Sequence, residues 1–290
     1  VAKQRAGGMS EGRIYAKIVR RGLTLVVLGM VYNGLFKLDF ENLRIASVLG
    51  RIGLAWSIAA VLYLNFGVKT RAAIAVAVLA GYGALSALVA APDAAGAGPL
   101  TFEGNLAGYI DRQFLPGKLI YGSFDPEGLL STVPAVVTAM LGMFTGEFVR
   151  RGDIRGGRKT LWMAAAAAAL LAAGLALSGV LPVNKKLWSS TFVCVVGAYS
   201  LGMFALFYYL IDVRGWRRWT LFFRVVGLNS ITIYLAQRIV GFGRISDFFL
   251  GGIASKCPEA VAAVISSAGY VAVCWLFLYF LYRKNVFLKV

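Results

Sequence analysis

The stretch LWMAAAAAALLAAGLALSGVL, residues 161–181, carries no charged side chain, and Ser178 is its one hydroxyl residue. Its apolar residues would cover every face of a helix, and the alternation typical of a β-barrel strand is absent. A helix needs about 20 residues of this kind to cross ~30 Å of hydrocarbon. The stretch therefore predicts a membrane-spanning α-helix, and with it an integral membrane protein.

Apolar blocks of similar length recur along the chain. Of its 290 residues, 59% are hydrophobic and only 15% are charged, whereas about a quarter of a soluble domain is charged. We predict an all-α, polytopic transmembrane helix bundle with about eight spans, which forms a single transmembrane domain over residues 1–290. The predicted spans are 22–36, 45–66, 72–91, 128–149, 161–181, 190–211, 220–240 and 260–282.

Lysines and arginines gather in alternate segments between these blocks, including 1–21, 150–159 and 283–290. The intervening segments hold fewer bases and most of the acidic residues, above all the long loop 92–127. Under the positive-inside rule, both ends of the chain lie in the cytoplasm and loop 92–127 lies outside. The same pattern accounts for the net charge of +17. Nucleic-acid binding is not expected, because no basic stripe is interleaved with stacking aromatics.

Several residue types that carry chemistry are scarce. The sequence contains no histidine, which excludes a histidine base, a histidine-ligated zinc and a Ser-His-Asp triad within these residues. Its three cysteines are scattered and form no CxxC pair, so no metal site is predicted. The chain begins with Val1 instead of Met and shows no signal peptide, and we expect further sequence to precede it.

Polar residues inside predicted spans are the first candidates for function. A charged side chain near the bilayer centre costs about 2.5–3.5 kcal/mol, so it needs a partner or a water-filled cavity. Arg51 is either an anion clamp or extends to the outer interface, and Arg224 extends to the inner interface or contacts phosphate. Asn229 and Ser230 form an interhelical hydrogen bond or a polar stripe facing a cavity. Glu147 lies near a span end, where extension to the interface is favoured.

The outer loop brings two acidic groups close in sequence, Asp111-Arg112 and Asp125-Pro126-Glu127-Gly128. Carboxylates just before a helix commonly cap its N-terminus and oppose its dipole. They are also groups that would hold the hydroxyls or the ammonium of an amino sugar. From their spacing alone, capping is favoured.

Six stretches occur in an order that resembles a known family. They are LRIASVLGRIG at 43–53, AGYIDR at 107–112, YGSFDPEGLLSTVPAVVTAMLG at 121–142, LPVNKKLWSSTFV at 181–193, GLNSITIY at 227–234 and LYRKNVFLKV at 281–290. Together they are similar to the heparan-α-glucosaminide N-acetyltransferase family and its bacterial relatives, over nearly the whole chain. The resemblance implies transfer of acetyl from cytoplasmic acetyl-CoA to the amino group of a glucosamine on the far side of a bacterial inner membrane.

The resemblance also implies roles for individual residues. The family's catalytic histidine has no counterpart here, so the catalytic base is unknown and is expected upstream of Val1. Residues assigned to the amino-sugar acceptor are Arg44, Asp111, Arg112, Asp125, Glu127, Asn184, Lys185 and Trp188. Residues assigned to acetyl-CoA are Arg21, Arg51, Arg224, Asn229 and Ser230. The chain departs from the family at Ala46-Ser47, where relatives often have Pro-Gly, which leaves the bend of that helix open.

Two other functions fit part of the same pattern. An amino-sugar or small-solute transporter would also use intramembrane arginines, although no internal inverted repeat is visible. A membrane scaffold could bind a partner through helix faces rich in small residues, but it would not need arginines inside the bilayer. The bilayer, acetyl-CoA and an amino sugar are the expected partners, and a homodimer is left open as the oligomeric state.

In the full-length protein, we expect Asn229→Ala to lower turnover more than it lowers coenzyme A binding. A polar group beside the thioester acts on the transfer step instead of holding the nucleotide. Steady-state rates, measured beside equilibrium binding of coenzyme A, test this assignment, and unchanged turnover would contradict it.

Overall fold

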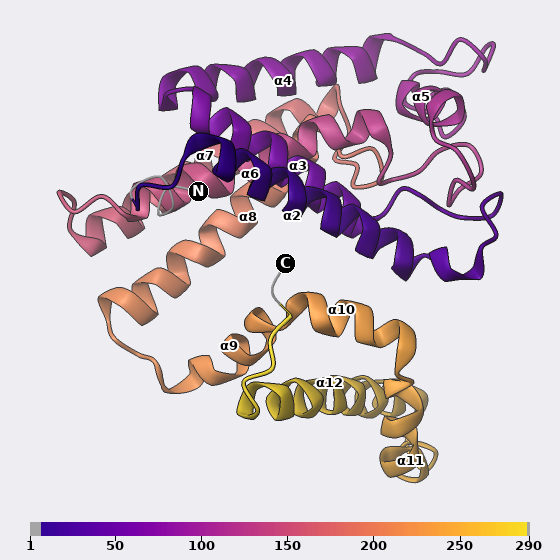
Figure 1. Ribbon diagram of the computed structural model, residues 1–290, viewed down its shortest axis with the longest axis vertical. Coiled ribbons are helices and arrows are strands. Elements are labelled where there is room, and N and C mark those ends of the chain that lie inside the picture. Colours follow the sequence, from indigo (N-terminus) through magenta and orange to yellow (C-terminus); the bar gives the residue numbers. More distant parts are fainter. Residues whose placement is uncertain (1–6, 289–290) are drawn as a thin grey trace. The chain divides into compact units, whose positions relative to one another are not determined.

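The computed structural model describes residues 7–288, and its regular secondary structure consists of helices (Figure 1). Within that range there is no strand, only isolated bridges that pair Arg44 with Gly117 and Ala90 with Asn105. The predicted all-α class is therefore confirmed. The prediction of cytoplasmic ends extends to residues 1–6 and 289–290, which lie outside the described residues.

The helices follow one another with short connections, except around α5. They are α2 Glu11–Tyr32, η1 Leu35–Lys37, α3 Val48–Asn65, α4 Val68–Leu88, α5 Leu106–Phe114, α6 Leu129–Val149, α7 Gly156–Ala176, η2 Leu177–Gly179, α8 Ser190–Tyr208, η3 Tyr209–Val213, η4 Arg218–Thr220, α9 Leu221–Leu228, α10 Ser230–Ile239, α11 Phe242–Ala254 and α12 Glu259–Arg283. They form two compact units, Val1–Arg214 and Gly215–Val290, and each is described by itself. A single transmembrane domain stays a prediction.

Six of these helices are long and apolar enough to cross a membrane: α3, α4, α6, α7 with η2, α8 with η3, and α12. A seventh span is added if η4–α9 and α10, which meet at an angle of 60°, are counted as one broken span. The predicted number of about eight is roughly compatible with this result. The protein is a multi-pass membrane protein by the length and composition of its helices.

Two of the predicted spans differ in kind from the helices observed, while the ends of the other six are displaced by at most about five residues. The span expected at 22–36 falls on α2, which begins at Glu11 and ends at Tyr32 because Gly34 turns the chain at a φ of +103°. The first turns of α2 carry five charged residues, so α2 is not among the six apolar helices. The span expected at 220–240 is broken at Asn229, and a further helix, α11, follows it.

Helices α2 and α3 lie side by side (Figure 1). They pack closely because glycines face each other across their contact. A Cβ atom added to Gly53 of α3 would lie 2.7 Å from the carbonyl oxygen of Gly22 and 2.8 Å from Cβ of Leu25, both in α2. Further along, Ile14 and Ile18 of α2 are buried against Ala60 of α3. Small residues let the two backbones approach, which is a common basis of helix association in membranes.

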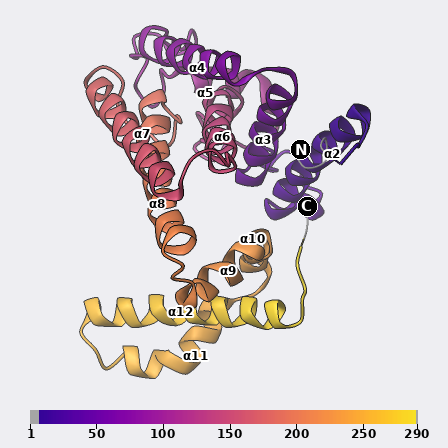
Figure 2. The ribbon, with the colours of Figure 1, turned by 90° about the vertical axis from the view of Figure 1, so that its left-hand side faces the viewer.

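Helix α6 lies at the centre of the first unit, with neighbours on several sides (Figure 2). Val137 and Met140 of α6 are buried among alanines of α3 and α4 and Val193 of α8. Helices α7 and α8 pack side by side, with Gly174 of α7 facing Cys194 and Val195 of α8. The N-terminus of α6 points to the end of the unit that also holds α5.

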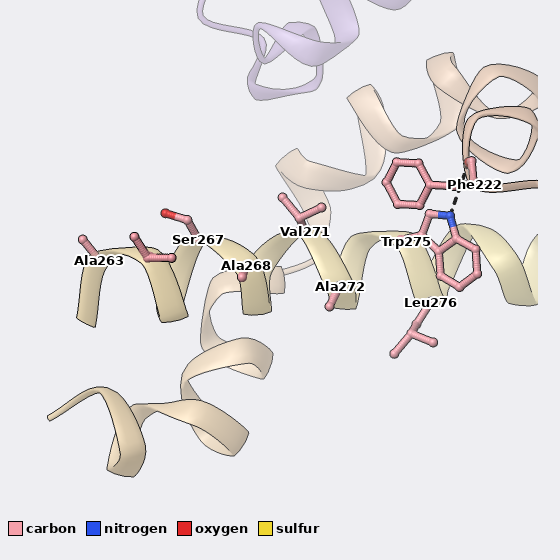
Figure 3. A pocket seen from close by; sticks show the side chains of 9 residues that line it. Phe222, Ala263, Ser267, Ala268, Val271, Ala272, Trp275 and Leu276 are labelled. Atoms are coloured by element: carbon pink, nitrogen blue, oxygen red, sulfur yellow. Dashed lines mark hydrogen bonds between the residues drawn. The ribbon is translucent and has the colours of Figure 1, made fainter. Parts of the chain in front are cut away.

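The second unit is built on the hairpin of α11 and α12 (Figure 2). Gly269 of α12 lies against Ser246 and Leu250 of α11. On another face of α12, Trp275 stacks on Phe222 of α9 with ring centroids 5.8 Å apart, and its Nε1 donates to the Phe222 carbonyl at 3.3 Å (Figure 3). These contacts attach α9 to the hairpin.

The glycine contact between α2 and α3 predicts an asymmetric response to valine. Gly53→Val would force the helices apart, and overpacking of this kind typically costs about 1–3 kcal/mol. Gly81→Val, on an exposed face of α4 with no atom within 4 Å, is the matched control. We expect the apparent melting temperature in detergent to fall for Gly53→Val and to change much less for Gly81→Val. Equal shifts would contradict the close packing of α2 on α3.

Candidate functional site

Arginines and carboxylates from three separate segments meet at the α5 end of the first unit. We call Arg44, Arg51, Asp111, Asp125 and Glu127 the acid–arginine network. Arg44 precedes α3, Arg51 lies in its first turn, Asp111 lies in α5, and the other two acids precede α6. The network therefore joins the starts of two neighbouring spans to the loop between α4 and α6.

Arg44 is the bridge of this network. Its Nε and Nη2 donate to the two carboxylate oxygens of Asp125 at 2.6 and 2.5 Å, and Nη2 also bonds the carboxylate of Glu127. Asp125 is only 1% exposed. Burial lowers the pKa of Arg44, but the hydrogen bonds and charges of Asp125 and Glu127 outweigh it and raise the pKa above its ordinary value. Such two-pronged, charge-assisted pairs are strong and directional.

Asp111 holds the loop to the first turn of α6. Its Oδ2 accepts from the backbone N–H of Asp125 at 3.1 Å, and its Oδ1 accepts from that of Leu129 at 2.9 Å. Burial raises the pKa of Asp111 to about 6, although the two backbone hydrogen bonds act in the opposite direction. The carboxylate that bonds the start of α6 thus comes from α5. Asp125 and Glu127, for which capping was favoured, face Arg44 instead.

Arg51 is buried between α3, α6 and the start of α8. Its Nη2 donates to Ser131 Oγ at 2.5 Å and to the carbonyl oxygen of Pro126. Its Cζ lies 4.7 Å from the centroid of the Trp188 ring, and Trp188 Nε1 donates to Thr138 Oγ1 at 3.2 Å. Nε and Nη1 of Arg51 have no hydrogen-bond partner in the part of the chain that the structure describes. The side chain therefore does not extend to solvent, and two of its donor groups are unused.

The remaining residues assigned to the acceptor shape the loops at this end. Arg112 pairs with Asp93 at 2.6 and 2.8 Å and donates to the Ser123 carbonyl at 2.5 Å. Asn184 Oδ1 accepts from the backbone N–H groups of residues 186 and 187 and closes a turn. Lys185 is exposed. Arg112 and Asn184 therefore position backbone, and Lys185 is accessible to a ligand.

The residues assigned to acetyl-CoA fall in both units. In the first unit, Arg21 lies over the ring of Trp56, with Cζ 4.5 Å from its centroid. In the second unit, Arg224 donates to the hydroxyl of Tyr282. Asn229 is 1% exposed and its Nδ2 has no partner among residues 7–288, whereas Ser230 is exposed. The coenzyme A role of these residues stays a prediction.

The sequence did not reveal a buried ion pair between α4 and α6. Arg71 Nη2 donates to both carboxylate oxygens of Glu147, at 2.9 and 3.0 Å, and Arg71 is only 4% exposed. Its guanidinium also lies 4.8 Å from the ring centroid of Tyr63. Glu147, expected to extend to the interface, is held by Arg71 instead. Opposite charges near the same predicted side of two spans were the signal that could have found the pair.

A cavity of about 470 Å³ adjoins the acid–arginine network. Its walls come from α2, α3, α4 and α6, and Arg51 and Glu127 are its two charged lining residues. No group of three or more His, Cys, Asp or Glu side chains that could hold a metal ion was found within residues 7–288. The site can therefore offer guanidinium donors, carboxylate acceptors and an apolar chamber.

Comparison with known proteins agrees with the resemblance seen in the sequence. The chain is 26% identical to human heparan-alpha-glucosaminide N-acetyltransferase. The alignment is 337 residues long and covers 98% of this chain and 50% of the human protein. The chain is 27% identical to the mouse protein of that name over 205 residues, which cover 64% of this chain and 30% of the mouse protein. The chain thus spans half or less of the length of these relatives. No family model matches it. The predicted resemblance to these N-acetyltransferases is confirmed.

The burial of the Arg44–Asp125 pair predicts a large cost for breaking it. Arg44→Gln would leave the carboxylate of Asp125 buried without a countercharge, which typically costs about 3–5 kcal/mol. Arg151→Gln breaks the exposed pair between Arg151 and Asp153 and is the matched control, since exposed pairs contribute little. We expect a marked fall in the apparent melting temperature for Arg44→Gln alone, measured by intrinsic fluorescence in detergent. If the melting temperature of Arg44→Gln falls no further than that of Arg151→Gln, the network stabilises the bundle no more than an exposed ion pair does.

Proposed function

We propose that this chain binds and orients the reactants of an acetyl transfer, from cytoplasmic acetyl-CoA to the amino group of a glucosamine-type sugar. In that reaction the amine nitrogen bonds the acetyl carbon, the thioester C–S bond breaks, coenzyme A leaves as its thiolate, and the amine loses a proton. The observation that carries the proposal is the assembly of the acid–arginine network. Residues from three of the six stretches that resemble the acetyltransferase family bond one another there.

The acceptor would bind at the α5 end of the first unit. Glu127 lines the cavity beside the network and keeps part of its side chain exposed, so its carboxylate is accessible to an ammonium group. Arg44 keeps that carboxylate in place. The loop that carries Asn184, Lys185 and Trp188 packs at the same end, since Leu187 is buried against Ala107 and Phe124. Sugar hydroxyls would find donors and an aromatic face here.

Acetyl-CoA, the acetyl donor, would be bound by arginine side chains and by the break between α9 and α10 at Asn229. Arg21 in the first unit and Arg224 in the second are the proposed partners of coenzyme A phosphates, because guanidinium matches phosphate geometry. Arg51, which the resemblance also assigned to coenzyme A, lines the cavity with Glu127 at the end where the acceptor would bind. In its own unit, Asn229 has a buried N–H group that is free to donate to a thioester oxygen or to the oxyanion that forms from it. Ser230 is its proposed neighbour in that role. The chain has no histidine, so we do not assign the proton acceptor to a histidine within it.

The cellular setting follows from the same proposal. The membrane helices require a lipid bilayer. A bacterial inner membrane, cytoplasmic chain ends and a homodimer stay predictions. A cytoplasmic donor requires that coenzyme A reach the protein from the side of the basic segments, which is the orientation that the positive-inside rule favours.

A permease for amino sugars is the second candidate. Helices α9 and α10 are together long and apolar enough for a membrane span but are bent by 60° at Asn229. Broken helices commonly form the substrate sites of transporters. The two functions differ in what they require of acetyl-CoA. Uptake of glucosamine into proteoliposomes without acetyl-CoA would support the permease.

The first experiment measures transfer of labelled acetyl from acetyl-CoA to glucosamine in detergent, with the full-length gene product and the 290-residue chain side by side. We expect Glu127→Gln to raise the KM for glucosamine about tenfold, because a charged hydrogen bond is worth about 1.5–3 kcal/mol. Coenzyme A binding should be unchanged.

Glu103→Gln is the control, since Glu103 is exposed in the same loop. The absence of any acetylated sugar from either protein, together with uptake of glucosamine without acetyl-CoA, would overturn the proposed enzyme.

A further inference from the structure

The cavity beside the acid–arginine network is apolar over most of its surface. Helices α2, α3, α4 and α6 contribute its walls, and the loops that precede α3 and α6 contribute its polar end. The apolar lining residues include Leu54 and Ile58 of α3, Val78 of α4, and Leu129 and Val133 of α6. A free sugar would lose its hydration among these side chains without gaining hydrogen bonds.

One side of the cavity faces the place where lipid would lie. Leu54 and Ile58 of α3, and Leu129 and Val133 of α6, line the cavity and are also exposed. Both helices are candidate membrane spans. A molecule that enters from this side would therefore come from the hydrocarbon of the bilayer, and not from water.

The polar end of the cavity has unused hydrogen-bond donors, and they belong to Arg51. Ser47 and Thr132 are engaged, because Ser47 Oγ accepts from the Gly50 N–H and Thr132 Oγ1 donates to the Gly128 carbonyl. Arg51 is 5% exposed and leaves Nε and Nη1 without acceptors in residues 7–288. Buried donors without acceptors are rare and costly, so a ligand oxygen at this end would remove a real penalty.

Arg51 and Glu127 are close enough to contact one head group. Arg51 Nη2 bonds the carbonyl oxygen of Pro126, the residue next to Glu127. The cavity thus presents a cation with free donors and a carboxylate side by side, at one end of an apolar chamber. The complementary ligand has an anionic group, an ammonium group near it, and a long hydrocarbon chain.

We propose that the acceptor is an amino sugar carried on a membrane lipid through a phosphate ester, and that this cavity receives its hydrocarbon chain. This inference rests on the proposed function. The phosphate oxygens accept from Nε and Nη1 of Arg51, the sugar ammonium faces Glu127, and the chain lies against α3, α4 and α6. In a glucosamine 1-phosphate ester, C1 bears the phosphate and the adjacent C2 bears the amine, so one head group can face both Arg51 and Glu127, which line the same cavity.

The test uses a glucosamine-1-phosphate ester of dodecanol that carries a diazirine near the end of its chain. The full-length protein is placed in nanodiscs of phosphatidylcholine and irradiated, and the labelled peptides are mapped. We expect labelling to concentrate on the cavity walls. Val78→Trp fills the cavity from α4 and should reduce labelling about tenfold, because several methylene groups lose their burial. Val76→Trp, on the exposed face of the same helix, should reduce it by less than about twofold.

Competition against the photoreactive ester tests which parts of the ligand are needed for binding. The unlabelled dodecyl ester should displace the probe, while soluble glucosamine-1-phosphate, dodecyl phosphate without sugar, and the N-acetylated ester should each compete about tenfold more weakly or worse. Equal competition by the soluble sugar phosphate would overturn the role of the chain. Equal competition by dodecyl phosphate or by the N-acetylated ester would overturn the role of the amine. Equal labelling of both tryptophan variants would overturn the cavity itself.

The outcome is distinguishable from failure of the proposed function. Acetylation of free glucosamine, combined with labelling scattered around all helices, would leave the acetyltransferase in place and overturn the lipid-linked acceptor. Labelling confined to the cavity, with no acetylation of either sugar, would support the binding site and overturn the acetyltransferase.

Discussion

The two-pronged bond between Arg44 and Asp125 fixes the end of the first unit on which the candidate site depends. It ties the chain entering α3 to the chain entering α6. With α6 held there, Asp111 accepts from the N–H group of Leu129, the first residue of α6, and Arg51 donates to Ser131 and the Pro126 carbonyl. The charged bonds close over an apolar chamber, and Val26 of α2 and Gly50 of α3 line another of its walls. Burial of the pair makes the arrangement rigid, since the charges have few alternative partners.

Much of the fold follows from the sequence because the bilayer imposes one length and one composition on every span. Helices α3, α4, α6, α7, α8 and α12 were found within a few residues in this way. Length and composition are less informative where a helix carries charged turns or changes direction. Helix α2 begins with charged turns, so its apolar part alone did not locate its start. The break at Asn229 leaves the residues on either side apolar, and hydropathy does not record a change of direction.

The residues of the candidate site could be predicted from the sequence, but the pairs that they form could not. The resemblance selected Arg44, Asp125 and Glu127, yet nothing in the sequence says which charge meets which across 81 residues. Spacing favoured capping by the acids that directly precede α6, whereas the cap comes from Asp111 in α5. The cavity could not be predicted either, because it arises from residues of four helices whose register is set only by their mutual packing.

The separation of Arg51 from its partners along the chain has a consequence for biosynthesis. Its hydrogen-bond acceptors lie 75 and 80 residues later, at the start of α6. When α3 leaves the ribosome and meets the membrane, those acceptors have not yet been synthesised, and an arginine alone in hydrocarbon is costly. We therefore expect the first turn of the nascent α3 to stay in the water-accessible translocon or among lipid head groups until α6 has been synthesised. Membrane insertion of α3 and α6 is in this sense one coupled event.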